Sequence, residues 1–319
     1  MNFLGELLAL ASAIFFGVSS VYMRLGLLKS SRDMAMIITL LVNNIINMMV
    51  IFIFWIQGLI PQLNLLGVFY FALAGFLTSN LGRLFHTSSM EFIGASRSTA
   101  FKVASPVFTV TIGILVLGEK VSWPALLGMA IAIMGLLVVT YSMGSNEVKK
   151  TQVTRTVPEE LVEIAGKEKN ISPDTIKKGI IFGLSAALAF SLGNITRKLG
   201  MDVLPSSIIG VAIGSFVAIT CFTLTMVASK GASEIKEKIT ANYSHSFALS
   251  GVFSSLALYS FFLALQYTTV SKANVIVNAE VLTTIIIGYF VLKKVEVINK
   301  LLILGAVSVL AGLILIILY

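Results

Sequence analysis

The chain has 319 residues, of which 57% are hydrophobic and only 12% are charged, whereas a soluble domain carries about 25% charged residues. Its mean hydropathy of +0.95 excludes a water-soluble domain and indicates an integral membrane protein. The net charge is +8, but most lysines and arginines lie between apolar runs, as topology determinants do, and not in the patches of nucleic-acid-binding proteins. The single cysteine, Cys221, excludes an intrachain disulfide and argues against a metal cluster. We expect no cofactor.

Ten apolar runs are long enough for transmembrane helices, which need about 20 residues. The first half of the chain contains runs at residues 4–28, 34–56, 65–86, 93–117 and 122–142. The second half contains runs at residues 179–199, 206–228, 246–266, 270–292 and 298–318. Strands of a membrane β-barrel would be about 10 residues long and would alternate in polarity, so we predict an all-α integral membrane protein with ten transmembrane helices.

The two halves of the chain resemble each other. LGMAIAIMGLL at 127–137 matches LGAVSVLAGLI at 304–314, and LVLGE at 115–119 matches FVLKK at 290–294. We therefore predict a first five-helix repeat at 1–143, a polar linker at 144–178 and a second repeat at 179–319. Because five is an odd number, the second repeat enters the membrane upside down, which is the inverted-repeat architecture of secondary transporters.

The basic residues of the loops predict an orientation. The linker carries seven of them, and further lysines join runs 7 to 8 and 9 to 10. Because basic loops stay in the cytoplasm, we predict a plasma (inner) membrane protein with a cytoplasmic linker and both termini outside.

The stretch SPVFTVTIGILVLGEKVSWPALLG, which starts at Ser105, and the glycine-rich fifth run resemble the EamA-type branch of the drug/metabolite transporter superfamily. The resemblance covers the chain apart from the linker and implies transport of small metabolites without naming a substrate. The second half departs from the family pattern, because Val281 replaces the usual proline and Lys293-Lys294 replace the usual Gly-Glu.

Charged residues within the apolar runs are the first candidates for a site, because a charge at membrane depth costs about 2.5–3.5 kcal/mol. Lys102 lies nearly halfway into run 4 and either binds an anionic group or pairs with Glu280 or Glu91. Arg97 and Lys272 occupy equivalent positions near the starts of runs 4 and 9. They either line an anion site, which helix N-termini also favour, or reach towards the headgroups.

Glu280 lies in the middle of run 9. Burial favours the protonated form of a carboxyl, so Glu280 either couples transport to protons or forms a permanent salt bridge with Lys102 or Lys272.

Polar residues at helical spacing are the second group of candidates. At α-helical period, one face of run 3 carries Asn80, Arg83 and Thr87. In the same way, one face of run 6 carries Asn194 and Arg197, and one face of run 9 carries Asn274 and Asn278. The asparagines, including Asn43, Asn44 and Asn47, either line a cavity or join helices. The predicted substrate-binding residues are Arg83, Arg97, Lys102, Lys272, Asn80, Asn274, Asn278 and Arg197, with Glu280 for ion coupling.

The leading hypothesis is a secondary-active transporter that works by alternating access between the two repeats. The cations outnumber the acids within the runs, which favours an anionic or zwitterionic small-molecule substrate. No GxxxxGK[ST] loop occurs, so an ion gradient or exchange would supply the energy.

The expected partners are the lipid bilayer and a second copy of the chain in a homodimer. Three alternative functions stay open. They are a lipid-carrier flippase, a sensor whose linker binds a protein, and a membrane enzyme using His86 and Glu91 of HTSSME. The glycines of runs 5 and 10 indicate close helix packing or a dimer face.

Overall fold

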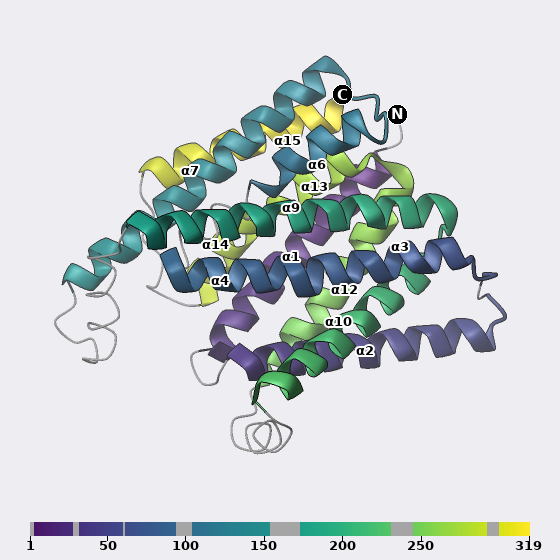
Figure 1. The fold of residues 1–319 in the computed structure, drawn as a ribbon. Helices are drawn as coiled ribbons and strands as arrows, with labels where there is room; N and C mark the ends of the chain where they lie inside the picture. Colours follow the sequence, from purple (N-terminus) through teal and green to yellow (C-terminus); the bar gives the residue numbers. More distant parts are fainter. Residues whose placement is uncertain are drawn as a thin grey trace. The chain divides into compact units, whose positions relative to one another are not determined.

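The structure, a computed structural model, describes residues 3–27, 32–59, 61–93, 104–153, 173–230, 245–291 and 300–319. The regular elements of these ranges are helices (Figure 1). Those of the first half are α1 (Leu4–Leu27), α2 (Arg32–Ile56), α3 (Leu65–Gly75), the π-helix η1 (Phe76–Gly82), α4 (Arg83–Ile93), α6 (Ser105–Leu115) and α7 (Trp123–Val153). Those of the second half are α9 (Pro173–Val203), α10 (Ser207–Lys230), α12 (His245–Tyr267), α13 (Val270–Asn278), α14 (Glu280–Val291) and α15 (Lys300–Leu318).

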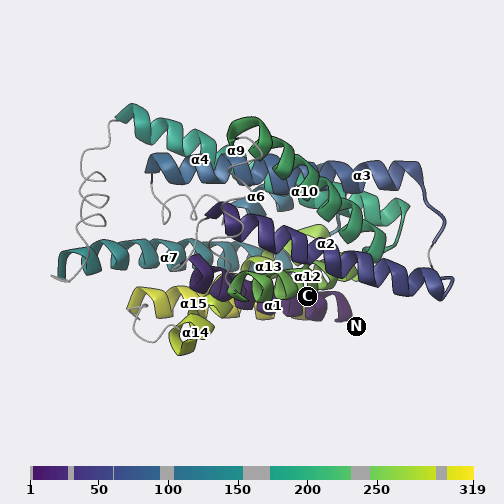
Figure 2. The same cartoon turned by 90° about the horizontal axis from the view of Figure 1, so that it is seen from below.

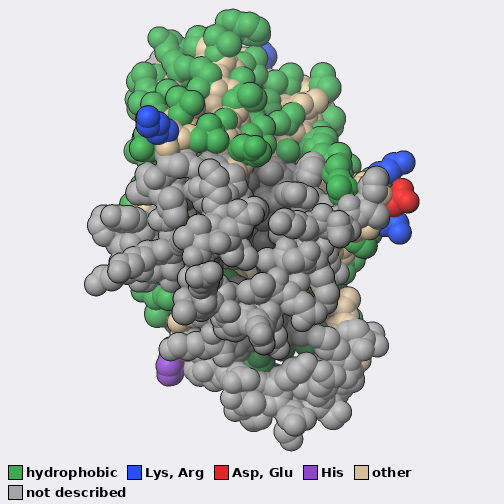
Figure 3. All heavy atoms as spheres, turned by 90° about the vertical axis from the view of Figure 1, so that its left-hand side faces the viewer, with side chains coloured by type: hydrophobic (Ala, Val, Ile, Leu, Met, Phe, Trp, Pro, Cys, Tyr) green, Lys and Arg blue, Asp and Glu red, His purple; other side chains and the backbone are tan. Residues whose placement is uncertain are grey.

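Each of the ten predicted runs overlaps a described helix, and residues 94–103 of run 4 lie outside the described residues. Six stretches are long and apolar enough to cross a membrane, namely Leu4–Met23, Met34–Ile56, Leu65–His86, Asp174–Val203, Ser207–Val227 and His245–Tyr267. On the face drawn in Figure 3, hydrophobic side chains cover most of the described surface. The prediction of an all-α integral membrane protein is confirmed.

The structure adds three features that the hydropathy pattern did not indicate. The third run changes from α-helix to π-helix over Phe76–Gly82, and the ninth run is divided into α13 and α14 at Ala279. The predicted linker at 144–178 is helical at both ends, where α7 continues to Val153 and α9 begins at Pro173; residues 154–172 lie outside the described part.

Several helix ends follow from local sequence. Asn64 caps α3, because its side-chain oxygen accepts hydrogen bonds from the backbone N–H groups of Leu66 and Gly67. Thr269 caps α13 in the same way through the N–H of Lys272. At the end of α6, Gly118 has φ of +65°, and the N–H of Glu119 donates to the carbonyl of Gly113. The LGE sequence therefore forms a cap and turn.

The described chain forms two compact units, and each contains segments of both sequence halves. Unit 1 comprises Met1–Asn80 and Leu192–Val295, and unit 2 comprises Leu81–Ser191 and Glu296–Tyr319. The boundaries fall within η1 and within α9. Compactness in three dimensions therefore does not follow the order of the repeats along the chain.

Within unit 1, α1 packs on α12, α13 and α14, and α2 packs on α10 and α12. Asparagines of α2 make hydrogen bonds to these neighbours. The Asn47 amide donates to the hydroxyl of Ser215 at 2.9 Å and accepts from Tyr259 at 2.8 Å, and the Asn43 amide contacts the hydroxyls of Ser254 and Ser255. Of the two roles predicted for these amides, joining helices is the one that their contacts show.

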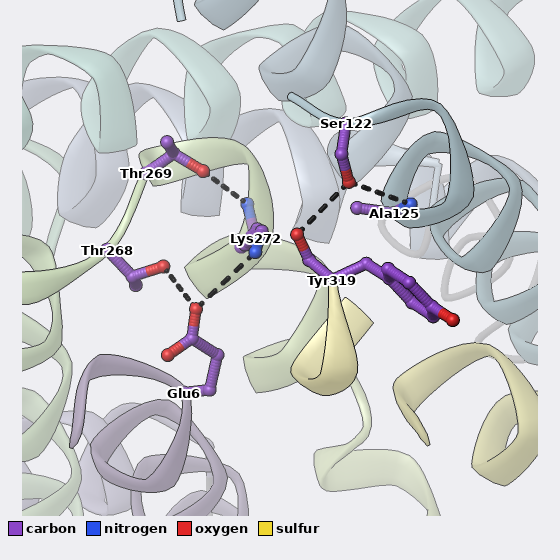
Figure 4. Close-up of polar contacts among 7 residues, drawn as sticks. All are labelled: Glu6, Ser122, Ala125, Thr268, Thr269, Lys272 and Tyr319. Atoms are coloured by element: carbon purple, nitrogen blue, oxygen red, sulfur yellow. Dashed lines mark hydrogen bonds and ion pairs between the residues drawn. The ribbon is translucent and has the colours of Figure 1, made fainter. Parts of the chain in front are cut away.

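Within unit 2, α7 and α15 lie side by side (Figures 1 and 2). A Cβ atom on Gly128 would lie 2.8 Å from the carbonyl oxygen of Gly312, and one on Gly135 would lie 2.8 Å from that of Gly305. The glycines of the fifth and tenth runs therefore pack against each other within one chain. At the end of the pair, the Ser122 hydroxyl donates to the Tyr319 carbonyl at 3.0 Å (Figure 4).

Candidate functional site: a polar cluster around Arg197

In unit 1, α9 packs antiparallel along α3 and η1. A Cβ atom on Gly67 would lie 2.6 Å from Cβ of Leu204, and one on Gly200 would lie 2.5 Å from the ring of Phe71. Further along the same pair, Gly193 contacts the methyl group of Thr78. The small residues allow a close approach and bring Arg197, one turn beyond Gly193, against η1.

Five polar side chains join in a continuous series, which we call the Arg197 cluster: Thr78, Asn194, Arg197, Asn274 and Asn278. The Arg197 guanidinium donates from Nη1 to Oδ1 of Asn194 at 2.9 Å and from Nη2 to Oγ1 of Thr78 at 3.0 Å. Asn194 donates to Oδ1 of Asn274 at 3.1 Å, and Asn278 donates to the same oxygen at 3.0 Å. The cluster therefore brings together three predicted site residues, Arg197, Asn274 and Asn278, from α9 and α13.

The Arg197 guanidinium rests on aromatic side chains. Its central carbon lies 5.8 Å from the ring centroid of Phe261 and 5.6 Å from that of Phe262. Both rings are buried, so the cation lies against an apolar surface with a favourable cation–π contact.

All of these partners are neutral. Within the described residues, no carboxylate forms an ion pair with Arg197; the acids with described ion pairs, Asp202 and Glu6, bind Lys198 and Lys272 instead. The positive charge of Arg197 therefore contacts one amide, one hydroxyl and two aromatic faces, and no negative charge of the described residues compensates it.

Two irregular helices border the cluster. Thr78 lies in the π-helix η1, and π-helical turns occur frequently at functional sites. Asn278 is the last residue of α13, whose backbone is interrupted at Ala279. Discontinuous helices form the substrate sites of many secondary transporters. Asn80, a predicted site residue, also lies in η1, and its amide nitrogen is buried without a hydrogen-bond partner in the described part of the chain.

Lys272, another predicted site residue, forms an ion pair that the sequence did not indicate (Figure 4). Its Nζ lies 3.7 Å from Oε1 of Glu6, and the hydroxyl of Thr268 donates to the same oxygen at 2.9 Å. The Lys272 and Glu6 side chains are 15% and 9% exposed. Among the described residues Lys272 therefore pairs with Glu6 and not with Glu280, and its charge is largely compensated.

The four remaining predicted site residues are Arg83, Arg97, Lys102 and Glu280. Arg97 and Lys102 lie outside the described residues. Arg83 is the first residue of α4, belongs to unit 2 and is half-buried. Glu280 is half-buried and begins α14, where the helix dipole favours a negative charge. Within the described ranges no group of His, Cys, Asp and Glu could hold a metal ion.

Sequence reasoning missed Thr78, Glu6 and the two phenylalanines. Thr78 is a single hydroxyl in an apolar run, and Glu6 lies in the first turn of α1, where an acid is ordinary. Both acquire a role only through partners far away in the sequence, 119 residues for Thr78 with Arg197 and 262 residues for Glu6 with Thr268. Asn194, by contrast, was indicated by its spacing of three residues from Arg197.

Comparison with known proteins places the chain in a family. The model of the EamA-like transporter family matches residues 3–141 and 177–318, so the chain belongs to the EamA-like transporter family. It is therefore a membrane transporter of the drug/metabolite transporter type, built from two repeats, and the resemblance seen in the sequence is confirmed.

One solved structure, described as "Crystal structure of protein", is similar with a TM-score of 0.70 over 98% of this chain and 96% of the other, at 10% identity. At that identity the likeness concerns the fold alone. The comparison with curated proteins gives no significant match.

Proposed function

We propose that the chain is a secondary-active transporter of small anionic or zwitterionic metabolites and has no enzymatic activity. It would work by alternating access between its two repeats, driven by an ion gradient or by exchange. The observation that carries the proposal is the Arg197 cluster, in which a guanidinium within a membrane-spanning helix has neutral partners and no acidic one among the described residues.

The energetics favour a role for this guanidinium beyond packing. A charge at membrane depth costs about 2.5–3.5 kcal/mol, and a neutral side chain would fill the same space without that cost. A guanidinium has five N–H donors, and two terminal nitrogens of Arg197 each use one in the cluster. The remaining donors suit a carboxylate or a phosphate, which arginine binds in a bidentate manner.

The other predicted residues have supporting roles in this proposal. Asn274, Asn278 and Asn80 supply amides near the cation, and Lys272 becomes available when its ion pair with Glu6 opens. The cations Arg83, Arg97 and Lys102 and the coupling acid Glu280 complete the proposed set of residues.

The membrane arrangement belongs to the same proposal. We place the protein in the plasma (inner) membrane with repeats at 1–143 and 179–319, a cytoplasmic linker at 144–178 and both termini outside. Because the glycines of α7 and α15 pack against each other, a homodimer would have to form through another surface.

The test is the thermal stability of the detergent-purified protein against metabolites sorted by charge. A ligand at 100 times its dissociation constant adds about 2.7 kcal/mol of stability. We expect carboxylated or phosphorylated compounds to raise the melting temperature of the wild type and of Lys198→Gln, but not of Arg197→Gln. Lys198 is the matched control, because it is the adjacent cation and already pairs with Asp202 at 2.8 Å.

Compounds that raise the melting temperature are then tested for uptake into proteoliposomes. Stabilisation by cations or lipids alone would contradict the anion site. An anion effect that survives in Arg197→Gln would remove Arg197 from it.

A further inference from the structure

We propose that Thr78 is a positioning residue, whose hydroxyl, presented by the π-helix η1, holds the Arg197 guanidinium in the orientation that receives an anionic group. The inference rests on the proposed function of Arg197. The π-helix and Thr78, which the hydropathy pattern did not indicate, would then both serve to position Arg197.

The hydroxyl of Thr78 has one proton, and that proton is already used. It is donated to the carbonyl of Ala74, one turn earlier, at 2.8 Å. A hydroxyl has one donor and two acceptor lone pairs, so towards Nη2 of Arg197, 3.0 Å away, it acts as an acceptor only. The bond to Ala74 thereby fixes the direction of the lone pairs, and Thr78 is 6% exposed, so water does not compete freely.

The second acceptor is fixed as well. Oδ1 of Asn194 accepts from Nη1 of Arg197, while Nδ2 of the same amide donates to Asn274. Because the nitrogen of Asn194 is engaged, the amide cannot turn over without losing a hydrogen bond. Each terminal nitrogen of Arg197 therefore has a fixed acceptor, and the rings of Phe261 and Phe262 lie near the guanidinium. Together these contacts determine the position and the orientation of the group.

The π-helix explains why a threonine occupies this place. A π-helical turn closes i→i+5 hydrogen bonds in place of the i→i+4 bonds of an α-helix, so it contains one extra residue. Each extra residue rotates the positions of the side chains that follow by about 100° around the helix axis. Thr78 lies within this segment, Phe76–Gly82. On the opposite helix, Gly193 has no side chain, and a Cβ atom there would collide with the Thr78 methyl group. The π-turn and Gly193 together allow the hydroxyl to reach Arg197.

The test measures the mobility of the guanidinium directly, without knowledge of the substrate. The chain has six arginines, so ¹⁵N-arginine labelling of the full-length protein in detergent gives few Nε–H signals, and loss of one signal in Arg197→Lys assigns Arg197. We expect Thr78→Val, which keeps the shape and removes the acceptor, to lower the order parameter of the Arg197 Nε–H. Thr78→Ser, which keeps the hydroxyl, should restore it.

Thr111→Val is the matched control. Its hydroxyl makes the same bond to a carbonyl one turn earlier, that of Val107 at 2.8 Å, on the exposed side of α6. The proposal is overturned if Thr78→Val leaves the order parameter unchanged, if Thr78→Ser does not restore it, or if Thr111→Val lowers it equally. Should Thr78→Val fail to fold, Thr78→Ala replaces it under the same criteria.

A second arm separates this inference from the proposed function. Acetate is titrated against chloride at equal ionic strength, and the chemical shift of the Arg197 signal is followed. We expect an acetate-specific shift in the wild type and a dissociation constant at least about ten times higher in Thr78→Val, because a hydrogen bond to a charged group is lost. If acetate gives no shift although Thr78→Val loosens the guanidinium, the anion site fails and the positioning role stands. An equal dissociation constant in both proteins would leave the anion site intact and overturn the positioning role.

Discussion

At the contact between α3 and α10, two glycines face each other, and only one of them has room for a side chain. A Cβ atom on Gly75 would lie 2.6 Å from the carbonyl oxygen and 2.8 Å from Cα of Gly214. These are backbone atoms, so the clash is relieved only if the helices move apart. A Cβ atom on Gly214 would meet nothing closer than 3.8 Å, which is ordinary van der Waals contact.

The difference between Gly75→Ala and Gly214→Ala isolates the clash. Each substitution gains up to about 1 kcal/mol of intrinsic helix propensity, which largely cancels in the comparison, whereas overpacking costs about 1–3 kcal/mol. Because 1 kcal/mol corresponds to about 2–4 °C for a chain of a few hundred residues, Gly75→Ala should melt about 2–12 °C below Gly214→Ala.

The assay is thermal unfolding of both variants and the wild type in one detergent at one heating rate, because irreversible melting depends on the scan rate. A melting temperature of Gly75→Ala equal to or above that of Gly214→Ala would refute the close approach of the two helices.

Two further predictions concern buried polar contacts. Breaking a fully buried ion pair costs about 3–5 kcal/mol. Glu6→Gln should destabilise the protein by less, because the ion pair with Lys272 is 3.7 Å long and its side chains are partly exposed. In a melting experiment the double variant Glu6→Gln/Lys272→Met should recover part of the loss, and no recovery would show that the two charges do not interact. Asn47→Leu should cost about 0.6–1.7 kcal/mol, because it loses contacts to Ser215 and Tyr259. A melting temperature unchanged from the wild type would mean that these bonds do not hold α2 in place.

Part of the candidate site could be predicted because it depends on spacing along one helix. Arg197 and Asn194 are three residues apart, and Asn274 and Asn278 are four apart, so an α-helix places each pair on one face. Both pairs form the expected contacts. The shared face of Asn80, Arg83 and Thr87 was predicted at α-helical period, but the helix is π-helical up to Gly82, which changes the register at Asn80.

The sequence by itself determined the membrane class and the helical runs, because hydropathy and periodicity act over a few neighbouring residues, and the likeness between its two halves indicated the repeat. Only the tertiary structure decided which charges are compensated. Glu6 pairs with Lys272, whereas Arg197 donates to the neutral acceptors Thr78 and Asn194. The contacts of Lys272 with Glu6 and of Arg197 with Thr78 join helices that are distant in the sequence. A charge looks alike in the sequence whether it is paired or not, and its role depends on which helices pack together, which is a property of the whole fold.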